Sequence, residues 1–69
     1  MNNKEFGERL KGAMKEKRIK SINLAEEMDV TVGCVSQWRR GIKKPNKDNL
    51  GYLAEVLGVT EGWLEHGTD

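Results

Sequence analysis

The sequence has few of the residues that stabilise secreted, metal-binding or membrane-spanning domains. It contains one cysteine and one histidine, so an intrachain disulfide and a zinc site are both excluded. No run of about 18 apolar residues exists, which excludes a transmembrane helix. The first twelve residues have no apolar core, so we expect no secretory signal. We therefore expect a reducing, cytoplasmic setting, with no metal and no membrane partner.

Combinations of residues that carry out catalysis are also scarce. The only histidine, His66, has no carboxylate at a spacing useful for catalysis, and no glycine-rich phosphate loop is present. His66 is best interpreted as a surface residue or a helix C-cap. We expect no enzymatic activity, no cofactor and no small-molecule ligand.

The length and the apolar spacing predict a single all-α domain over residues 1–69. Of these residues, 36% are hydrophobic and 33% are charged, which is typical of a small helical domain. No alternating apolar–polar run predicts a strand. Helical spacing and end signals predict five helices, at residues 4–17, 21–28 and 32–40, between Asn46 and Gly58, and between Thr60 and Gly67.

Capping residues, and apolar residues that recur on one face of each helix, support these five helices. We expect Asn2 or Asn3, Thr31, Asn46 and Thr60 to act as N-caps. Gly7 and Gly12 are expected to weaken the first helix by roughly 0.5–1 kcal/mol each. The expected core positions are Phe6, Leu10, Ala13, Met14, Leu24, Ala25, Met28, Val35, Trp38, Ile42, Leu50, Leu53, Ala54 and Leu57.

Charge is unevenly distributed along the chain, although the net charge is only +1. All twelve Lys and Arg residues lie before position 48, and residues 32–47 contain no acid. Residues 48–69 contain five acids and no Lys or Arg. This asymmetry favours one surface that attracts phosphate and another that repels it, over a surface of mixed solvated charge.

Residues 24–41 read as two short helices joined by a tight turn. On the second of these helices, Val35, Trp38 and Ile42 have the spacing of one inward face. The opposite face carries Gly33 and Gln37, followed by Arg40. A small residue, an amide and a guanidinium suit the edge of a nucleic acid, which indicates a DNA-binding module.

These residues resemble the helix-turn-helix family of lambdoid phage repressors and Cro proteins, also called the XRE family. The resemblance runs from Phe6 to Gly67, and it includes the small residue Ala25 where the two helices of the motif cross. The later positions also follow the family: Leu50, Leu53-Ala54, Leu57-Gly58-Val59-Thr60 and Trp63-Leu64. The resemblance implies a compact five-helix, lambda-repressor-like DNA-binding domain whose second and third helices form the helix-turn-helix.

Three positions depart from the family pattern. Asp29 stands where a turn glycine is usual, so we expect it in a left-handed conformation at modest cost. Ser21 stands where the family often has a glutamine that donates to a phosphate. Met14 and Arg39 stand where many members have a buried Arg–Glu pair. We expect Met14 to pack in the core and Arg39 to turn toward solvent or phosphate.

The resemblance implies which residues contact DNA, because in this fold the third helix enters the major groove with its N-terminal residues nearest the bases. Gln37 suits adenine, Val32 suits a thymine methyl group, and Gly33 permits close backbone approach. Packing against the second helix is an equally good interpretation of Val32. The candidate base contacts are Thr31, Val32, Gly33, Ser36 and Gln37. The candidate phosphate contacts are Lys20, Ser21, Asn23, Arg40, Lys43, Lys44 and Lys47.

The function implied is that of a sequence-specific transcriptional regulator of double-stranded DNA. A phage or prophage repressor headpiece and a stand-alone Cro-like protein both fit. We expect a weak homodimer that strengthens on a pseudo-palindromic operator, with Trp63 and Leu64 at its interface or closing the core. The alternative is a protein-interaction module, such as an antitoxin or adaptor. That alternative predicts exposed apolar residues on the third helix, whereas Gln37, Arg39 and Arg40 are polar.

Overall fold

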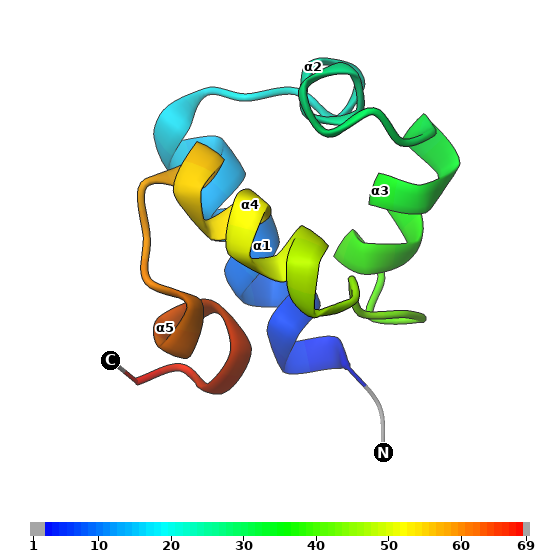
Figure 1. The fold of residues 1–69 in the computed structure, drawn as a ribbon. Coiled ribbons are helices and arrows are strands. Elements are labelled where there is room, and N and C mark those ends of the chain that lie inside the picture. Colours follow the sequence, from blue (N-terminus) through cyan, green and yellow to red (C-terminus); the bar gives the residue numbers. More distant parts are fainter. Residues whose placement is uncertain (1–2, 69) are drawn as a thin grey trace.

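Five helices are present in the computed structural model, which describes residues 3–68 (Figure 1). Their order and bounds are α1 (Lys4–Lys17), α2 (Ser21–Met28), α3 (Val32–Arg39), α4 (Lys47–Leu57) and α5 (Glu61–His66). The described part of the chain contains no strand. The five helices expected from the sequence are therefore confirmed, except that α3 ends one residue earlier than expected.

Side-chain caps fix the starts of three helices. Thr31, Asn46 and Thr60 accept hydrogen bonds from the backbone N–H groups three residues later, at 2.8–3.0 Å. Each such cap contributes about 1 kcal/mol. Asn3 occupies the N-cap position of α1, as expected, but its side chain makes no capping hydrogen bond. Asn2 lies outside the described residues.

Two turns around α3 have left-handed backbone conformations. Asp29 ends α2 with φ 57° and ψ 45°, as its position in the motif predicts. Gly41 has φ 76° and reverses the chain after α3. Because of this reversal, Ile42 does not continue the inward face of α3. The expectation that Ile42 is buried is therefore wrong, since 52% of its surface is exposed.

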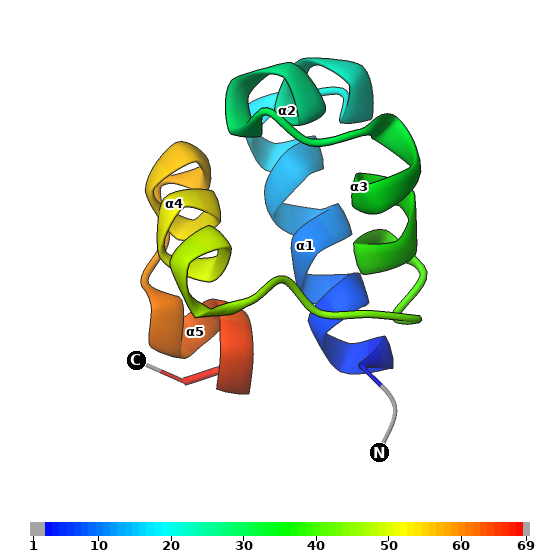
Figure 2. The same ribbon diagram turned by 45° about the vertical axis from the view of Figure 1, so that its right-hand side comes forward.

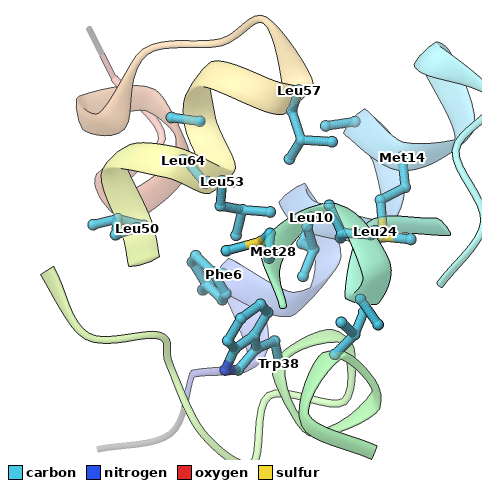
Figure 3. Packing of buried hydrophobic residues seen from close by; sticks show 14 residues of the cluster. Phe6, Leu10, Met14, Leu24, Met28, Trp38, Leu50, Leu53, Leu57 and Leu64 are labelled. Carbon is cyan, nitrogen blue, oxygen red and sulfur yellow. The ribbon is translucent and has the colours of Figure 1, made fainter. Parts of the chain in front are cut away.

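The core lies around α1, which contacts α3, α4 and α5 (Figure 2). Figure 3 shows its apolar side chains converging from all five helices. Apart from Ile42, every core position expected from the sequence is buried, and Leu64 joins them with none of its surface exposed. The core is therefore shared among the helices, and it holds α2 and α3 in one fixed arrangement.

The start of α1 and the end of α3 approach each other very closely. A Cβ atom added to Gly7 would lie 2.5 Å from the backbone oxygen of Arg39 and 3.1 Å from the backbone nitrogen of Gly41. The N–H of Asn3 donates to the Gly41 carbonyl at 3.3 Å. Gly7 is thus required by the packing of α1 against α3, and this contact positions α3.

Arg9 joins α1 to the C-terminal end of α5. Its Nε donates to the carbonyl of Leu64 and its Nη2 to that of Glu65, both at 2.8 Å. The last carbonyls of a helix have no partner within the helix, and a cation there also interacts favourably with the helix dipole. Arg9 therefore holds α5 against the rest of the domain.

Candidate nucleic-acid interface

The outer surface of α3 is anchored from within by two buried side chains. None of the Val35 surface and only 3% of the Trp38 surface is exposed. In both ribbon views α3 lies at the edge of the molecule (Figures 1 and 2). The sequence-based prediction that Val35 and Trp38 face inward is confirmed. The rest of α3 is consequently held at the surface as a rigid element.

The candidate base contacts fall on the exposed side of α3. Thr31, Val32 and Gly33 are exposed, with 46% of the Val32 surface accessible. Ser36 and Gln37 are half-buried one turn further along. Val32 and Ser36, like Gly33 and Gln37, are four positions apart and so share one face of α3. Together with the N-cap Thr31, we call these residues the α3 strip.

Gly33 has no packing reason to be a glycine. A Cβ atom there would meet only the Thr31 hydroxyl oxygen, at an ordinary 3.8 Å. The residue also lies inside α3, where glycine costs about 0.5–1 kcal/mol relative to alanine. Gly33 therefore leaves the backbone of α3 open to close approach, in contrast to Gly7, which the core requires.

Exposed polar side chains, most of them basic, lie at the start of α2 and after α3. Lys20 and Asn23 are exposed at the start of α2, and Arg40, Lys43 and Lys47 are exposed after α3. The N-cap of α2 is Lys20, which makes no side-chain capping bond. The first N–H groups of α2 therefore have no side-chain cap, and such groups favour an anion.

Two candidate phosphate contacts already have partners in the free protein. The Lys44 Nζ lies 3.1 Å from a Glu65 carboxylate oxygen. The hydrogen bond and charge of Lys44 lower the pKa of Glu65. Ser21 Oγ accepts a hydrogen bond from Arg39 Nη1 at 2.8 Å. Sequence reasoning did not predict either contact, because each partner lies far along the chain.

Arg39 differs from its sequence-based expectation. Met14 packs in the core as expected, with 4% of its surface exposed. Arg39, however, does not extend into solvent: it is half-buried and reaches from the end of α3 to Ser21 at the start of α2. Its Nε is buried and has no hydrogen-bond partner. The expectation that Arg39 turns toward solvent is therefore wrong, whereas a contact of Arg39 with phosphate stays a prediction.

The two candidate dimer residues have different positions. Leu64 is fully buried, so its side chain closes the core and is unavailable to a partner chain. Trp63 is half-buried and lines a surface hollow of about 460 Å³, with Gly12, Leu57 and Val59. Only Trp63 of the pair therefore remains a candidate for self-association.

The described residues contain no cluster of His, Cys, Asp and Glu that could hold a metal ion. None of the helices within residues 3–68 is long and apolar enough to cross a membrane.

Comparisons with known proteins agree with this geometry. A family model described as "Helix-turn-helix" matches residues 10–64. Repressor protein C2 of Salmonella phage P22 and the HTH-type transcriptional regulator DicA of Escherichia coli (strain K12) are each 31% identical to this chain over 67 residues, or 97% of it. These matches cover 31% of C2 and 50% of DicA. The chain thus spans half or less of the length of these curated relatives.

A solved structure extends the similarity to three dimensions. It is the crystal structure of the P22 c2 repressor protein in complex with synthetic operator 9T in the presence of Tl⁺. Its TM-score against this chain is 0.86, with 30% sequence identity, covering 91% of this chain and 96% of that one. The arrangement of all five helices is therefore shared with a protein whose structure was solved on an operator.

Proposed function

Because the chain belongs to the helix-turn-helix (XRE) family, we propose that it binds an operator in double-stranded DNA and represses transcription by occupying it. One observation carries the proposal. Val35 and Trp38 are buried and anchor α3, while the residues at the start of α3 are exposed. Because the target is operator DNA, we place the protein in the cytoplasm of a prokaryotic or phage-infected cell. This role requires binding only, and no chemical step.

Sequence is read by the strip on α3. The N-terminal turn of α3 enters the major groove, where Gln37 makes a bidentate contact with adenine. Val32 contacts a thymine methyl group, and Gly33 lets the backbone approach the base edges. Thr31 and Ser36 supply hydroxyl groups at the edge of the same strip.

Phosphate contacts position the strip without reading sequence. Lys20, Ser21 and Asn23 bind one stretch of backbone at the start of α2. The second group, which follows α3, consists of Arg40, Lys43, Lys44 and Lys47. Support for this division comes from the exposure of these side chains, apart from the half-buried Ser21, at the start of α2 and after α3.

The experiment that tests this proposal is selection of bound duplexes from a pool of random sequence. We expect enrichment of one short motif, repeated with inverted symmetry at a spacing of about one helical turn. Recovery of a random pool, with the same composition as the input, would contradict sequence-specific binding.

Replacing Glu65 with glutamine should strengthen DNA binding. The Glu65 carboxylate forms an ion pair with Lys44. Replacing this carboxylate with a neutral amide therefore frees the Lys44 ammonium group to bind a DNA phosphate. Because the pKa of Glu65 is lowered, the parent carboxylate keeps its charge as the pH falls below the usual range for glutamate. The contribution of the Lys44–Glu65 ion pair to the free energy of unfolding is therefore lost only as the pH falls through the lowered pKa of Glu65.

We expect Glu65→Gln to bind all duplexes roughly two- to fivefold more tightly at pH 7, as the loss of one exposed ion pair allows. Glu61→Gln, on the same helix, is the matched control for the change in net charge. Equal gains in Glu65→Gln and Glu61→Gln, measured by fluorescence anisotropy, would show that only net charge matters.

We further propose that two copies bind one operator. A single α3 covers one half-site, and two-fold related half-sites lie ~34 Å apart. Self-association uses the hollow beside Trp63, and we expect it to be weak without DNA. Sedimentation should show a monomer free in solution and two chains per duplex on an operator, with Trp63→Ala weakening only the second state. One chain per duplex at saturation would exclude this arrangement.

A further inference from the structure

The hollow beside Trp63 has the size and the lining of a small-molecule site. Its volume is about 460 Å³, and ligand pockets in proteins usually measure ~300–1,000 Å³. Its apolar walls come from α1, from the end of α4 with the turn that follows it, and from α5: Ala13, Leu57, Val59 and Trp63. A mostly apolar wall with a few polar groups is typical of such pockets. Because no single helix contains these positions, spacing along the chain could not indicate the site.

Gly12 widens this hollow without being needed by the core. It lies inside α1 and lines the hollow, and a Cβ atom added to it would meet nothing within 4 Å. Glycine inside a helix is destabilising relative to alanine, but it permits close approach to the backbone. Gly7, in the same helix, is instead required by the contact with α3. Gly12 is therefore better explained by a molecule that approaches α1 than by packing.

The two cations that line the hollow lie against helix C-termini. Arg9 donates to two carbonyls in the last turn of α5, at 2.8 Å each. The Nζ of Lys17 lies 3.2 Å from the position that a Cβ atom of Gly58, the C-cap of α4, would occupy. The C-terminal end of a helix carries roughly half a negative charge. These helix ends therefore offset part of the charge of Arg9 and Lys17.

The two carboxylates of the hollow have a weak partner or none. Glu8 lies 3.0 Å from Lys11 in an exposed ion pair, which contributes little. Within residues 3–68, Glu16 makes no ion pair and no side-chain hydrogen bond. Because the helix ends add negative charge to these two carboxylates, the hollow has an excess of negative charge. A cation is therefore favoured here over an anion, and an aromatic wall such as Trp63 also attracts cations.

We propose that the hollow beside Trp63 binds a small organic cation with a flat apolar body, such as an aromatic amine, and that the bound cation excludes a second copy of the chain. The apolar body packs against Trp63, Val59 and the backbone at Gly12, and the ammonium group lies by Glu16. The exclusion rests on the proposed function, which places self-association at the same hollow. Occupancy of the hollow thus regulates how many chains bind one operator.

The first part of the experiment uses three probes with the same phenyl body and no DNA. These probes are phenethylammonium, the neutral 2-phenylethanol and the anion phenylacetate, at constant ionic strength and pH 7. We expect phenethylammonium to shift the amide signals of Gly12 and Val59 and the indole signal of Trp63 saturably. Its affinity should exceed that of 2-phenylethanol roughly two- to fivefold, the range of an exposed ion pair, and phenylacetate should bind more weakly still.

Two variants locate the charge and the space. Glu16→Gln should lower the affinity for phenethylammonium roughly two- to fivefold and leave that for 2-phenylethanol unchanged. Glu5→Gln is the matched control, because Glu5 is an exposed glutamate of α1 that does not line the hollow. Gly12→Leu should lose binding of all three probes, since its side chain fills the hollow and leucine is a good helix former.

Three results of this first part would overturn the site. One is the absence of saturable shifts at Gly12, Val59 and Trp63 in the parent chain. Another is equal affinity for the cation, the neutral probe and the anion, which would leave an apolar surface without charge selection. The third is an equal affinity of Glu16→Gln and Glu5→Gln for phenethylammonium. This last comparison decides the proposal even if Gly12→Leu does not fold, because Glu16 is exposed.

The second part measures the number of chains on a selected operator duplex by sedimentation, with and without phenethylammonium. We expect two chains per duplex to become one, while binding to a duplex with a single half-site stays unchanged. Two chains per duplex with the hollow occupied would overturn the exclusion. If the parent chain binds no duplex, or only one chain per duplex without the cation, the proposed function fails in that respect, while the titration without DNA still decides whether the hollow binds cations.

Discussion

Gln37→Ala is expected to remove sequence preference while leaving much of the affinity for random DNA. Gln37 is the last residue of the α3 strip, and its amide presents an N–H donor and a carbonyl acceptor on two separate atoms. A bidentate amide–adenine contact contributes ~1–3 kcal/mol of discrimination. We therefore expect the ratio of operator to random affinity to fall roughly five- to 150-fold, as measured by competition binding at fixed salt.

Lys43→Ala provides the contrast to this result. Lys43 is exposed beyond the end of α3 and carries charge alone. Its removal should weaken operator and random duplexes alike and lower the salt slope by about 0.9. If Gln37→Ala and Lys43→Ala changed operator and random affinity by the same factors, the division into reading and positioning residues would be wrong.

Gly7→Ala and Gly12→Ala should shift stability in opposite directions, although they are the same change in one helix. At Gly7 the new methyl group would lie 2.5 Å from the Arg39 carbonyl oxygen, so α1 and α3 must move apart. We expect a loss of about 3 kcal/mol, at the upper end for an overpacked contact. At Gly12 nothing lies within 4 Å, and a gain of about 0.5–1 kcal/mol is expected from helix propensity.

Urea unfolding followed by circular dichroism measures both changes. Gly7→Ala should also weaken operator binding, because the displaced contact positions α3. Gly12→Ala serves as the control for alanine in α1, and its DNA binding is compared with the parent on a single half-site, because Gly12 lines the hollow beside Trp63. Equal effects of the two substitutions on stability would contradict the close packing of α1 against α3.

The helices and the core were predictable because their signals are local. Apolar spacing of three and four residues placed Leu24, Met28, Val35 and Trp38 inward, and all four are buried. Hydroxyl and amide caps likewise set the starts of three helices. The prediction for Ile42 was wrong because Gly41, with φ 76°, ends the helical spacing just before Ile42.

The side-chain partners within the candidate site were not predictable in the same way. Arg39 meets Ser21 across 18 positions of sequence, and Lys44 meets Glu65 across 21. Such pairs depend on how the helices cross, which spacing along one helix does not encode. The acid-free block of residues 32–47 did indicate where cations gather. It could not indicate that one of them, Lys44, is paired with a carboxylate of α5.

The most direct test of the account is a map of backbone amide shifts on titration with a selected duplex. Residues 31–37, the start of α2 and the loop after α3 should move most, because the proposed function places them against the groove and its flanking phosphates. Residues around Tyr52 on α4 should move little. Shifts that centre on α4, or on the hollow beside Trp63 with α3 unchanged, would contradict the claim that α3 is the element that reads DNA.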